Sequence, residues 1–173
     1  MGAWYIINEM LQFFKELQVQ HNNAKFLIVT NSNHDIVLQK HAIFNLCAKD
    51  FIIVTVPFSK VSEYIYVCDV SISFIKQVYS KISSSPVKIG EILSMGIPMI
   101  SNAIGDIGKF FLEEKVGILI KDFSSNTFSS AVKIVKECTL IDPKLIREVA
   151  IKYYNLQKGI EKYATVYDEI FMS

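Results

Sequence analysis

The stretch that decides the fold of this chain is SSPVKIGEILSMGIPMI, residues 84–100. It begins as a short polar loop, continues as an amphipathic helix around Glu91, stops at Gly96 and ends in an apolar run typical of a buried strand. The free backbone N–H groups and the dipole at the start of such a helix favour an anion such as phosphate. Glu91 lies about one helical turn further on, where it can accept hydrogen bonds from hydroxyl groups.

Composition limits the class of protein. The chain has 173 residues, 51% of them hydrophobic, and a mean hydropathy of +0.31, which indicates one folded domain with a core. The formal charge is +1, from 18 basic and 17 acidic residues, so charge gives no reason to expect nucleic acid as a partner. No apolar run reaches the roughly 18 residues that cross a bilayer, and residues 1–5 lack the pattern of a secretory signal. We therefore expect a cytoplasmic protein.

The cysteines and histidines suggest no reactive or metal-binding centre. The cysteines are far apart, odd in number and set in apolar sequence, so we interpret Cys47, Cys68 and Cys138 as buried, reduced thiols. A catalytic cysteine would need a partner histidine, and the sequence suggests none for any of the three. The histidines show no metal-ligand spacing, so we expect no metal, and surface or helix-capping roles for His21, His34 and His41.

Short apolar strands alternate with helical segments along the whole chain, which predicts an α/β fold: a Rossmann-like, doubly wound parallel sheet with helices on both faces. The expected strands are 25–30 (buried on both faces), 51–56, 70–74, 97–101 and 117–120. The expected helices are 4–20, 35–48, 59–66, one around Glu91 that stops at Gly96, 106–114, 126–137, 143–154 and 159–171, with Asp142 capping the helix that starts at Pro143.

Residues 1–173 show no internal repeat and no low-complexity linker, so we expect a single domain. The chain opens directly in a helix after Gly2, whereas a doubly wound domain normally begins with its central strand. We therefore expect a fragment of a larger protein, with the first strand and a further domain upstream.

Ligands of open parallel sheets bind beyond the carboxyl ends of the strands, and four segments fit that place: 2–5, 56–59, 74–88 and 102–108. Segment 74–88 is the richest, because it holds Lys76, Lys81 and the run Ser83-Ser84-Ser85 before Pro86 and Lys88. A solvated loop of ordinary turn residues explains this segment equally well. Glu91 could simply complement the helix dipole, and Lys88 could be a solvated charge.

The order of four motifs adds a resemblance. The segment from Ser85-Pro86-Val87-Lys88 through Glu91 to Gly96-Ile97-Pro98 resembles the donor-binding, C-terminal half of retaining GT-B glycosyltransferases. Residues 67–73 resemble the family's Asp-containing strand, 105–108 its glycine-containing loop and 114–120 its strand with a variable residue, glycine and aliphatic residues. The resemblance covers about residues 56–123 specifically and the flanking helices only in pattern.

The resemblance implies roles for these residues. Glu91 would hold the ribose hydroxyls, and the loop with Ser84, Ser85, Pro86 and Lys88 would hold the diphosphate. Val56 and Pro57 would contact the base, and Gly2 would remain from the glycine turn that approaches the diphosphate. The substrate would be a UDP- or GDP-linked sugar, without a cofactor or metal; no catalytic residue is assigned.

Two departures from the family pattern concern the donor site. Many members carry a second glutamate eight positions before the first, where this chain has Ser83. The family's basic pair near the first helix is also not evident, since only Lys15 lies there. The diphosphate charge would then fall on Lys88, Lys81 or Lys76.

The leading hypothesis is a hexosyl-transferase type glycosyltransferase of polysaccharide or glycolipid synthesis, whose N-terminal acceptor-binding domain is a separate half. The isolated chain would then be inactive, and peripheral membrane association of the full-length enzyme stays open. The alternative is a degenerate, non-catalytic protein-interaction module. A nucleotide-sugar epimerase would need further carboxylates and a histidine, and a nicotinamide dehydrogenase would need Gly-x-Gly-x-x-Gly, which is absent.

The final helix, 159–171, repeats apolar residues at helical spacing. We expect most of this face to pack against the sheet. In GT-B enzymes the terminal helix often crosses toward the other domain, so part of the face would be exposed in this chain and would favour self-association.

Overall fold

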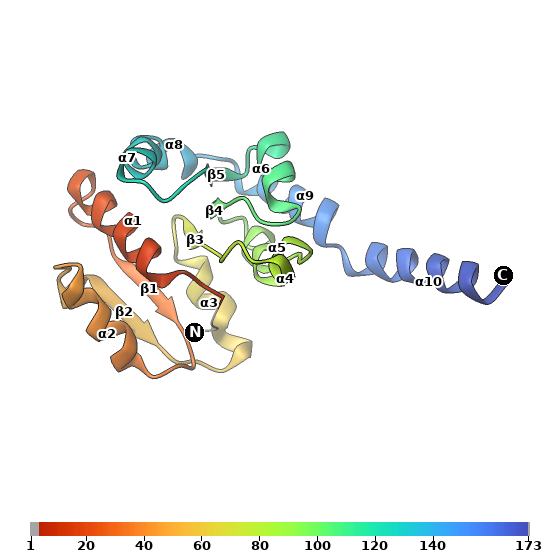
Figure 1. Ribbon diagram of the computed structural model, residues 1–173, viewed down its shortest axis with the longest axis horizontal. Helices are drawn as coiled ribbons and strands as arrows, with labels where there is room; N and C mark the ends of the chain where they lie inside the picture. The colour runs from red at the N-terminus through yellow and green to blue at the C-terminus, as the bar shows by residue number, and fades with distance from the viewer. Residues whose placement is uncertain (1–3, 173) are drawn as a thin grey trace.

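The computed structural model describes residues 4–172, apart from the side chains of Ile36, Val37 and His41 (Figure 1). Parallel strands alternate with helices along this range. The strands are β1 (Phe26–Val29), β2 (Phe51–Val54), β3 (Ser71–Ser73), β4 (Met99–Asn102) and β5 (Gly117–Ile120). The helices are α1 (Ile7–Gln20), α2 (His34–Ile43), η1 (Ala48–Asp50), η2 (Phe58–Lys60), α3 (Val61–Tyr66), α4 (Tyr79–Ile82), α5 (Val87–Ser94), α6 (Ile107–Glu114), α7 (Ser125–Lys133), α8 (Val135–Cys138), α9 (Pro143–Tyr154) and α10 (Leu156–Met172).

The strands form two parallel sheets rather than the one continuous sheet that the sequence predicts. β1 pairs with β2, and β3, β4 and β5 form a second sheet in that order. Figure 1 shows β1 between β2 and β3, and no ladder joins β1 to β3 within residues 4–172. The α/β class with parallel strands and flanking helices is confirmed, and the separation between β1 and β3 is a correction to the single sheet.

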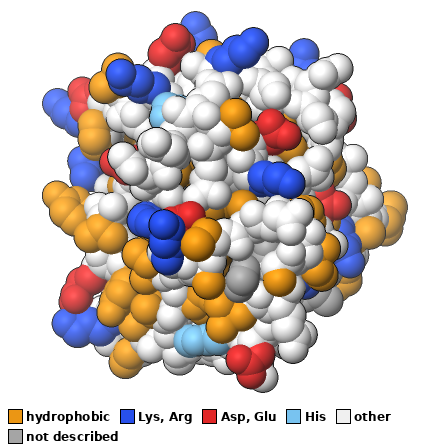
Figure 2. Space-filling model, turned by 90° about the vertical axis from the view of Figure 1, so that its left-hand side faces the viewer, with side chains coloured by type: hydrophobic (Ala, Val, Ile, Leu, Met, Phe, Trp, Pro, Cys, Tyr) orange, Lys and Arg blue, Asp and Glu red, His pale blue; other side chains and the backbone are white. Residues whose placement is uncertain are grey.

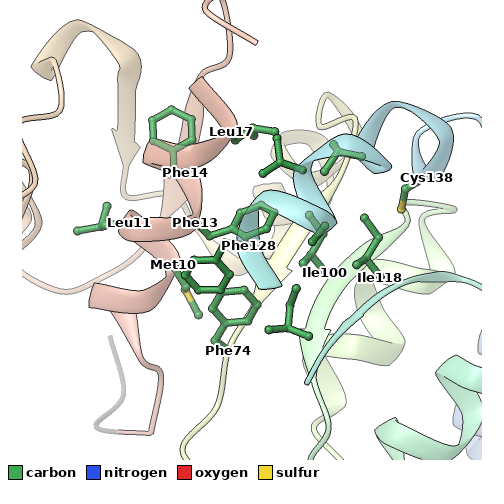
Figure 3. Packing of buried hydrophobic residues seen from close by; sticks show 14 of the residues in the cluster. Met10, Leu11, Phe13, Phe14, Leu17, Phe74, Ile100, Ile118, Phe128 and Cys138 are labelled. Carbon is green, nitrogen blue, oxygen red and sulfur yellow. The ribbon is translucent and has the colours of Figure 1, made fainter. Parts of the chain in front are cut away.

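One face of the three-stranded sheet packs against α1 and α7. The side chains that point to this face include Ile100, Ile118 and Ile120. Phe13 of α1 meets Phe128 of α7 edge to face, with ring centroids 5.4 Å apart, and both rings pack on Phe74 (Figure 3). The same cluster continues to Ile28 and Phe51, so α1 binds the two sheets into one core.

The opposite face of this sheet packs against α5, α6 and α9. Met99 and Leu119 point to this side, as the alternation of side chains along a strand requires, and they meet buried residues from each helix: Ile89, Leu93, Ile107, Phe110 and Ile146. Helices therefore cover both faces of the β3–β5 sheet, as predicted.

Several boundaries match the sequence prediction and others do not. The limits of α9 and β5 are those predicted, and the Asp142 side chain caps α9 by accepting from Lys144 N–H at 2.9 Å. The first helix begins at Ile7 rather than at residue 4, because Tyr5 pairs with Ile75 in an antiparallel bridge. β1 was predicted to be buried on both faces, but of its four residues only Ile28 is buried.

The last helix departs most from the prediction. α10 projects from the body of the molecule (Figure 1), and none of its described residues is buried. The expectation that most of its apolar face packs against the sheet is wrong, because the chain turns away after Tyr154 and none of the other described elements covers the helix. Its exposed apolar side chains are Leu156, Ile160, Tyr163, Val166, Tyr167, Ile170, Phe171 and Met172.

Two further surface features correct or extend the sequence analysis. Cys47 is exposed, contrary to the prediction, because it lies just before the surface turn η1; Cys138 is buried and Cys68 half-buried.

Figure 2 views the molecule from the left-hand side of Figure 1, where α1, α2, β1 and β2 lie, and shows hydrophobic side chains gathered on that face. Exposed apolar residues of α2 and β2 include Leu38, Ile43 and Ile52. None of the described helices combines the length and the hydropathy needed to cross a membrane.

Candidate functional site

A surface hollow of about 260 Å³ lies between the segment before α1, the end of β3 and the start of α5. We call it the Lys81–Lys88 hollow after the two cations that line it. Its described lining contains no acidic side chain, so its charge complements an anion. The lining residues are Trp4, Tyr5, Ile75, Lys81, Ser84, Ser85, Pro86, Val87 and Lys88.

The floor of the hollow is built from backbone pairing beyond the carboxyl end of β3. Lys76 N–H donates to the carbonyl of Trp4 at 2.9 Å, and Ile6 N–H donates to Phe74 at 3.0 Å. The buried side chain of Asn102, at the end of β4, accepts from Ile75 N–H at 2.8 Å and donates to Ile75 C=O at 2.9 Å. These bonds fix the place where the chain leaves the sheet and enters the loop of the hollow.

Aromatic rings hold both cations at the hollow. The Lys81 ammonium lies 4.8 Å from the ring centroid of Trp4, and the Lys88 ammonium lies 5.2 Å from that of Tyr5. Such contacts orient an ammonium group without neutralising its charge, so both lysines remain free to pair with an anion. Burial raises the pKa of the Tyr5 hydroxyl, and the negative charge of Glu91 raises it further, which places Glu91 near this ring.

The helix α5 opens toward the hollow. Pro86 stands at its N-cap position and makes no side-chain cap hydrogen bond, so the first N–H groups of the helix are not satisfied by a cap side chain. The α5 helix has eight residues and carries Lys88 in its first turn. Its dipole therefore adds a partial positive charge to that of the lysines.

The loop before α5 rests on the loop after β4. Ser84 Oγ donates to the Lys81 carbonyl at 2.9 Å, which closes the turn after α4. Gly105 has φ +51°, and a Cβ atom there would lie 2.5 Å from the carbonyl oxygen of Ser84. Only glycine allows this backbone conformation and this close approach without strain. The backbone of Gly105 thus packs directly against the backbone of Ser84, in the loop before α5.

The structure brings together part of the predicted site. Ser84, Ser85, Pro86 and Lys88 all line the hollow, while Glu91 lies one turn further along α5 and is exposed. Val56 and Pro57 follow β2 and do not line it. Gly2 lies outside the described residues.

Sequence reasoning missed two contributors to the site. Tyr5 was expected at the start of a helix and within the candidate segment 2–5, with no role of its own, although it lines the hollow and holds Lys88. Asn102 was only a member of a candidate loop, although it fixes Ile75. Neither has a local sequence signal, because both act through contacts with distant segments. Across residues 4–172 no group of three His, Cys, Asp or Glu side chains is arranged to hold a metal ion.

Comparisons with known proteins give structural likeness only. No family model matches the chain, and no curated protein matches its sequence. Among solved structures, WaaG, a glycosyltransferase involved in lipopolysaccharide biosynthesis, superposes with a TM-score of 0.74 at 13% identity, over 95% of this chain and 44% of WaaG.

Two further structures show the same likeness. A G117R mutant of S. aureus TarM, solved in a complex with Fondaparinux, alpha-GlcNAc-glycerol and UDP, matches with a TM-score of 0.75 at 16% identity, over 95% of this chain and 33% of TarM. Sucrose-phosphate synthase from Thermosynechococcus elongatus matches with a TM-score of 0.70 at 15% identity, over 98% of this chain and 44% of the synthase. The chain thus spans less than half the length of each of these proteins. Its parallel strands and flanking helices have the Rossmann-like fold of GT-B glycosyltransferase domains.

Proposed function

We propose that this chain is the donor-binding, C-terminal half of a glycosyltransferase and that the Lys81–Lys88 hollow holds the diphosphate of a nucleotide sugar. The observation that carries this proposal is the meeting of two ammonium groups and the uncapped start of α5 at one hollow, beside the carboxyl ends of parallel strands. That edge is where open α/β sheets bind ligands. TarM, which shares the fold, was solved with UDP.

The chemistry follows from where the positive charge lies. Transfer of a sugar from a nucleotide diphosphate proceeds through an oxocarbenium-like transition state in which the diphosphate departs with growing negative charge. Lys81, Lys88 and the α5 dipole stabilise that charge as it develops, which is the usual source of most of the rate enhancement. The resemblance to the retaining family implies that the configuration at the sugar is kept.

The rest of the donor extends from the hollow in two directions. Glu91 lies one turn beyond Lys88 on α5, where its carboxylate accepts hydrogen bonds from the ribose hydroxyls. Val56 and Pro57, after β2, contact the base of a UDP- or GDP-linked donor. Ser83, at the end of α4, stands where many family members have a glutamate facing the donor sugar. In this chain an uncharged hydroxyl, rather than a carboxylate, would contact the sugar.

We also propose that the chain works with a second, acceptor-binding domain of the same protein. Within residues 4–172, β1 and β3 each pair with a strand on one side only, and a doubly wound sheet places its first strand between two such strands. A strand from an N-terminal segment would join the two sheets into one. The described chain alone then binds donor weakly and catalyses no transfer, and the acceptor, a polysaccharide or glycolipid that brings the enzyme to a membrane surface, is selected by the other half.

Calorimetric titration of the chain with UDP, GDP, ADP and their sugar conjugates, with NAD as a control, tests the proposal. We expect saturable binding of one nucleoside diphosphate. Lys88→Ala should weaken the diphosphate more than the matching nucleoside, because only the former carries the charge that Lys88 contacts. Lys133→Ala, which removes an exposed lysine of α7, is the matched control and should leave the affinity unchanged.

A non-catalytic protein-interaction module is the second candidate, favoured by Ser83 and by the exposed apolar side chains of α10. The same titrations separate the two. Flat titrations with the chain and with the full-length protein would reject the donor site and support the module, whereas binding by the full-length protein alone would keep the enzyme.

A further inference from the structure

Tyr154, the last residue of α9, has a polar group that the proposed donor site leaves unused. Its hydroxyl oxygen is buried and has no hydrogen-bond partner of ordinary geometry among the described residues. A buried polar atom without a partner costs about 1–3 kcal/mol, so its retention calls for an explanation. The neighbours of this hydroxyl are Ser85, in the loop of the hollow, and Asp106, before α6.

Packing aims the Tyr154 side chain at the loop of the hollow. The ring lies directly over Gly90 of α5: a Cβ atom at Gly90 would be 2.5 Å from Tyr154 Cγ and 2.6 Å from Cδ1. On its other side the ring meets Phe110 edge to face, with the ring centroids 6.1 Å apart. The phenol is thus held between α5 and α6, and its direction is fixed by these contacts.

Helix α9 contacts α5 near both ends of α5. At the C-terminal end of α5, Arg147 donates to the carbonyl of Met95 at 3.2 Å. At its N-terminal end, Tyr154 reaches the segment that precedes the helix. α5 is the element that carries Lys88 and Glu91, so α9 sets the position of both.

We propose that Tyr154 is a positioning residue for the donor site, whose hydroxyl donates to Ser85 Oγ and so turns the Ser85 proton toward an anion in the Lys81–Lys88 hollow. The inference rests on the proposed function for the identity of that anion, the diphosphate of a nucleotide. Burial raises the pKa of Tyr154; Ser85 offsets part of this rise and the charge of Asp106 adds a lesser one, so the pKa stays above its ordinary value and the phenol keeps its proton.

Tyr154→Phe tests the inference, because it removes the hydroxyl and keeps the ring over Gly90. We expect about fivefold weaker binding of whichever of UDP, GDP or ADP the unmodified chain binds, and unchanged binding of its nucleoside. The control is Tyr153→Phe, which removes the neighbouring hydroxyl that bonds Glu114 on the surface at 2.9 Å. The effect of Tyr154→Phe should vanish in a Ser85→Ala background, which a merely structural role would not produce.

Amide hydrogen exchange of residues 83–88 without ligand makes the test independent of the proposed function. Tyr154→Phe should speed exchange in this segment, and Tyr153→Phe should not. If neither the unmodified chain nor the full-length protein binds any of the three nucleotides but exchange still responds, the positioning contact stands and the proposed function falls. Unchanged exchange in Tyr154→Phe would overturn the inference, and so would unchanged affinity for a nucleotide that the chain does bind.

Discussion

Asn102 satisfies both backbone polar groups of Ile75 with its side-chain amide, as a neighbouring strand would. The pair joins the end of β4 to the first residue of the hollow's loop after β3, and both residues are buried. Asn102→Ala would leave a buried N–H and a buried C=O without partners. We expect a loss of about 2–4 kcal/mol in the free energy of unfolding, measured with urea.

Asn126→Ala is the control for this change, because Asn126 is an exposed residue of α7. It should lower the unfolding free energy by less than about 0.5 kcal/mol. Equal stability of Asn102→Ala and the unmodified chain would show that water or another group replaces the amide. The two hydrogen bonds from Asn102 would then not be what fixes Ile75 at the start of the loop.

Glu91 provides the second prediction. If its carboxylate holds the ribose hydroxyls, Glu91→Ala removes charge-assisted hydrogen bonds that are worth about 1.5–3 kcal/mol, so affinity for the nucleoside diphosphate should fall at least tenfold. Glu91 is exposed on α5, so the melting temperature should change little. Glu169→Ala, on α10, is the matched control, and an affinity of Glu91→Ala equal to that of the control would remove Glu91 from the site.

Acid sensitivity should depend on Asp50. This carboxylate accepts from Lys25 Nζ at 2.7 Å and from Gln18 Nε2 at 2.9 Å, which ties η1 to α1 and to the segment before β1. These bonds hold the pKa of Asp50 below its ordinary value of 3.8. A carboxyl group with a lowered folded-state pKa stabilises the protein above about pH 4, and that contribution disappears as pH falls through the lower value.

Urea unfolding between pH 7 and pH 2 measures this contribution. Asp50→Asn should be less stable than the unmodified chain at pH 7, and the difference should shrink toward pH 2. Asp168→Asn, on exposed α10, makes the same change of charge and should change the unfolding free energy at pH 7 by less than about 0.5 kcal/mol. A difference for Asp50→Asn that does not vary with pH would contradict the ionic account.

The thiols give a test of burial. Burial raises the pKa of Cys138 to about 11, so at pH 8 this thiol is both protonated and shielded, whereas Cys47 is exposed. A thiol-reactive disulfide reagent should modify Cys47 quickly in the folded chain and Cys138 only after unfolding. Cys47→Ser should abolish the fast phase. Persistence of the fast phase in that variant would place the reactive thiol at Cys68 or Cys138 instead.

The sequence predicts the parts of this fold that local chemistry controls. Asp142 and Pro143 mark the start of α9, and the limits of β5 follow from its short apolar run after Lys115. Ser84, Ser85, Pro86 and Lys88 are adjacent in the chain, so their meeting at one hollow follows from the turn before α5. Tyr5, Asn102 and Tyr154 act across 27 or more residues, and no periodicity or cap reveals such contacts.

The same limit explains α10. An apolar stripe at helical spacing predicts that a helix has a face to bury, but not which surface covers it. In this chain none of the described residues covers that face, although the sequence analysis expected the sheet to do so.

We expect the exposed stripe of α10 to cause self-association of the chain. Ile160, Tyr163, Tyr167 and Ile170 repeat at intervals of three and four residues and are all exposed, and an apolar surface of this kind is rare on a monomer in solution. Tyr163→Ser combined with Ile170→Ser should shift sedimentation-velocity profiles to the monomer. Lys162→Ser combined with Glu169→Ser changes the polar face of the same helix and should leave the association intact. A monomeric unmodified chain would contradict self-association through α10, and equal loss in both double variants would show that helix content rather than the apolar stripe decides the assembly.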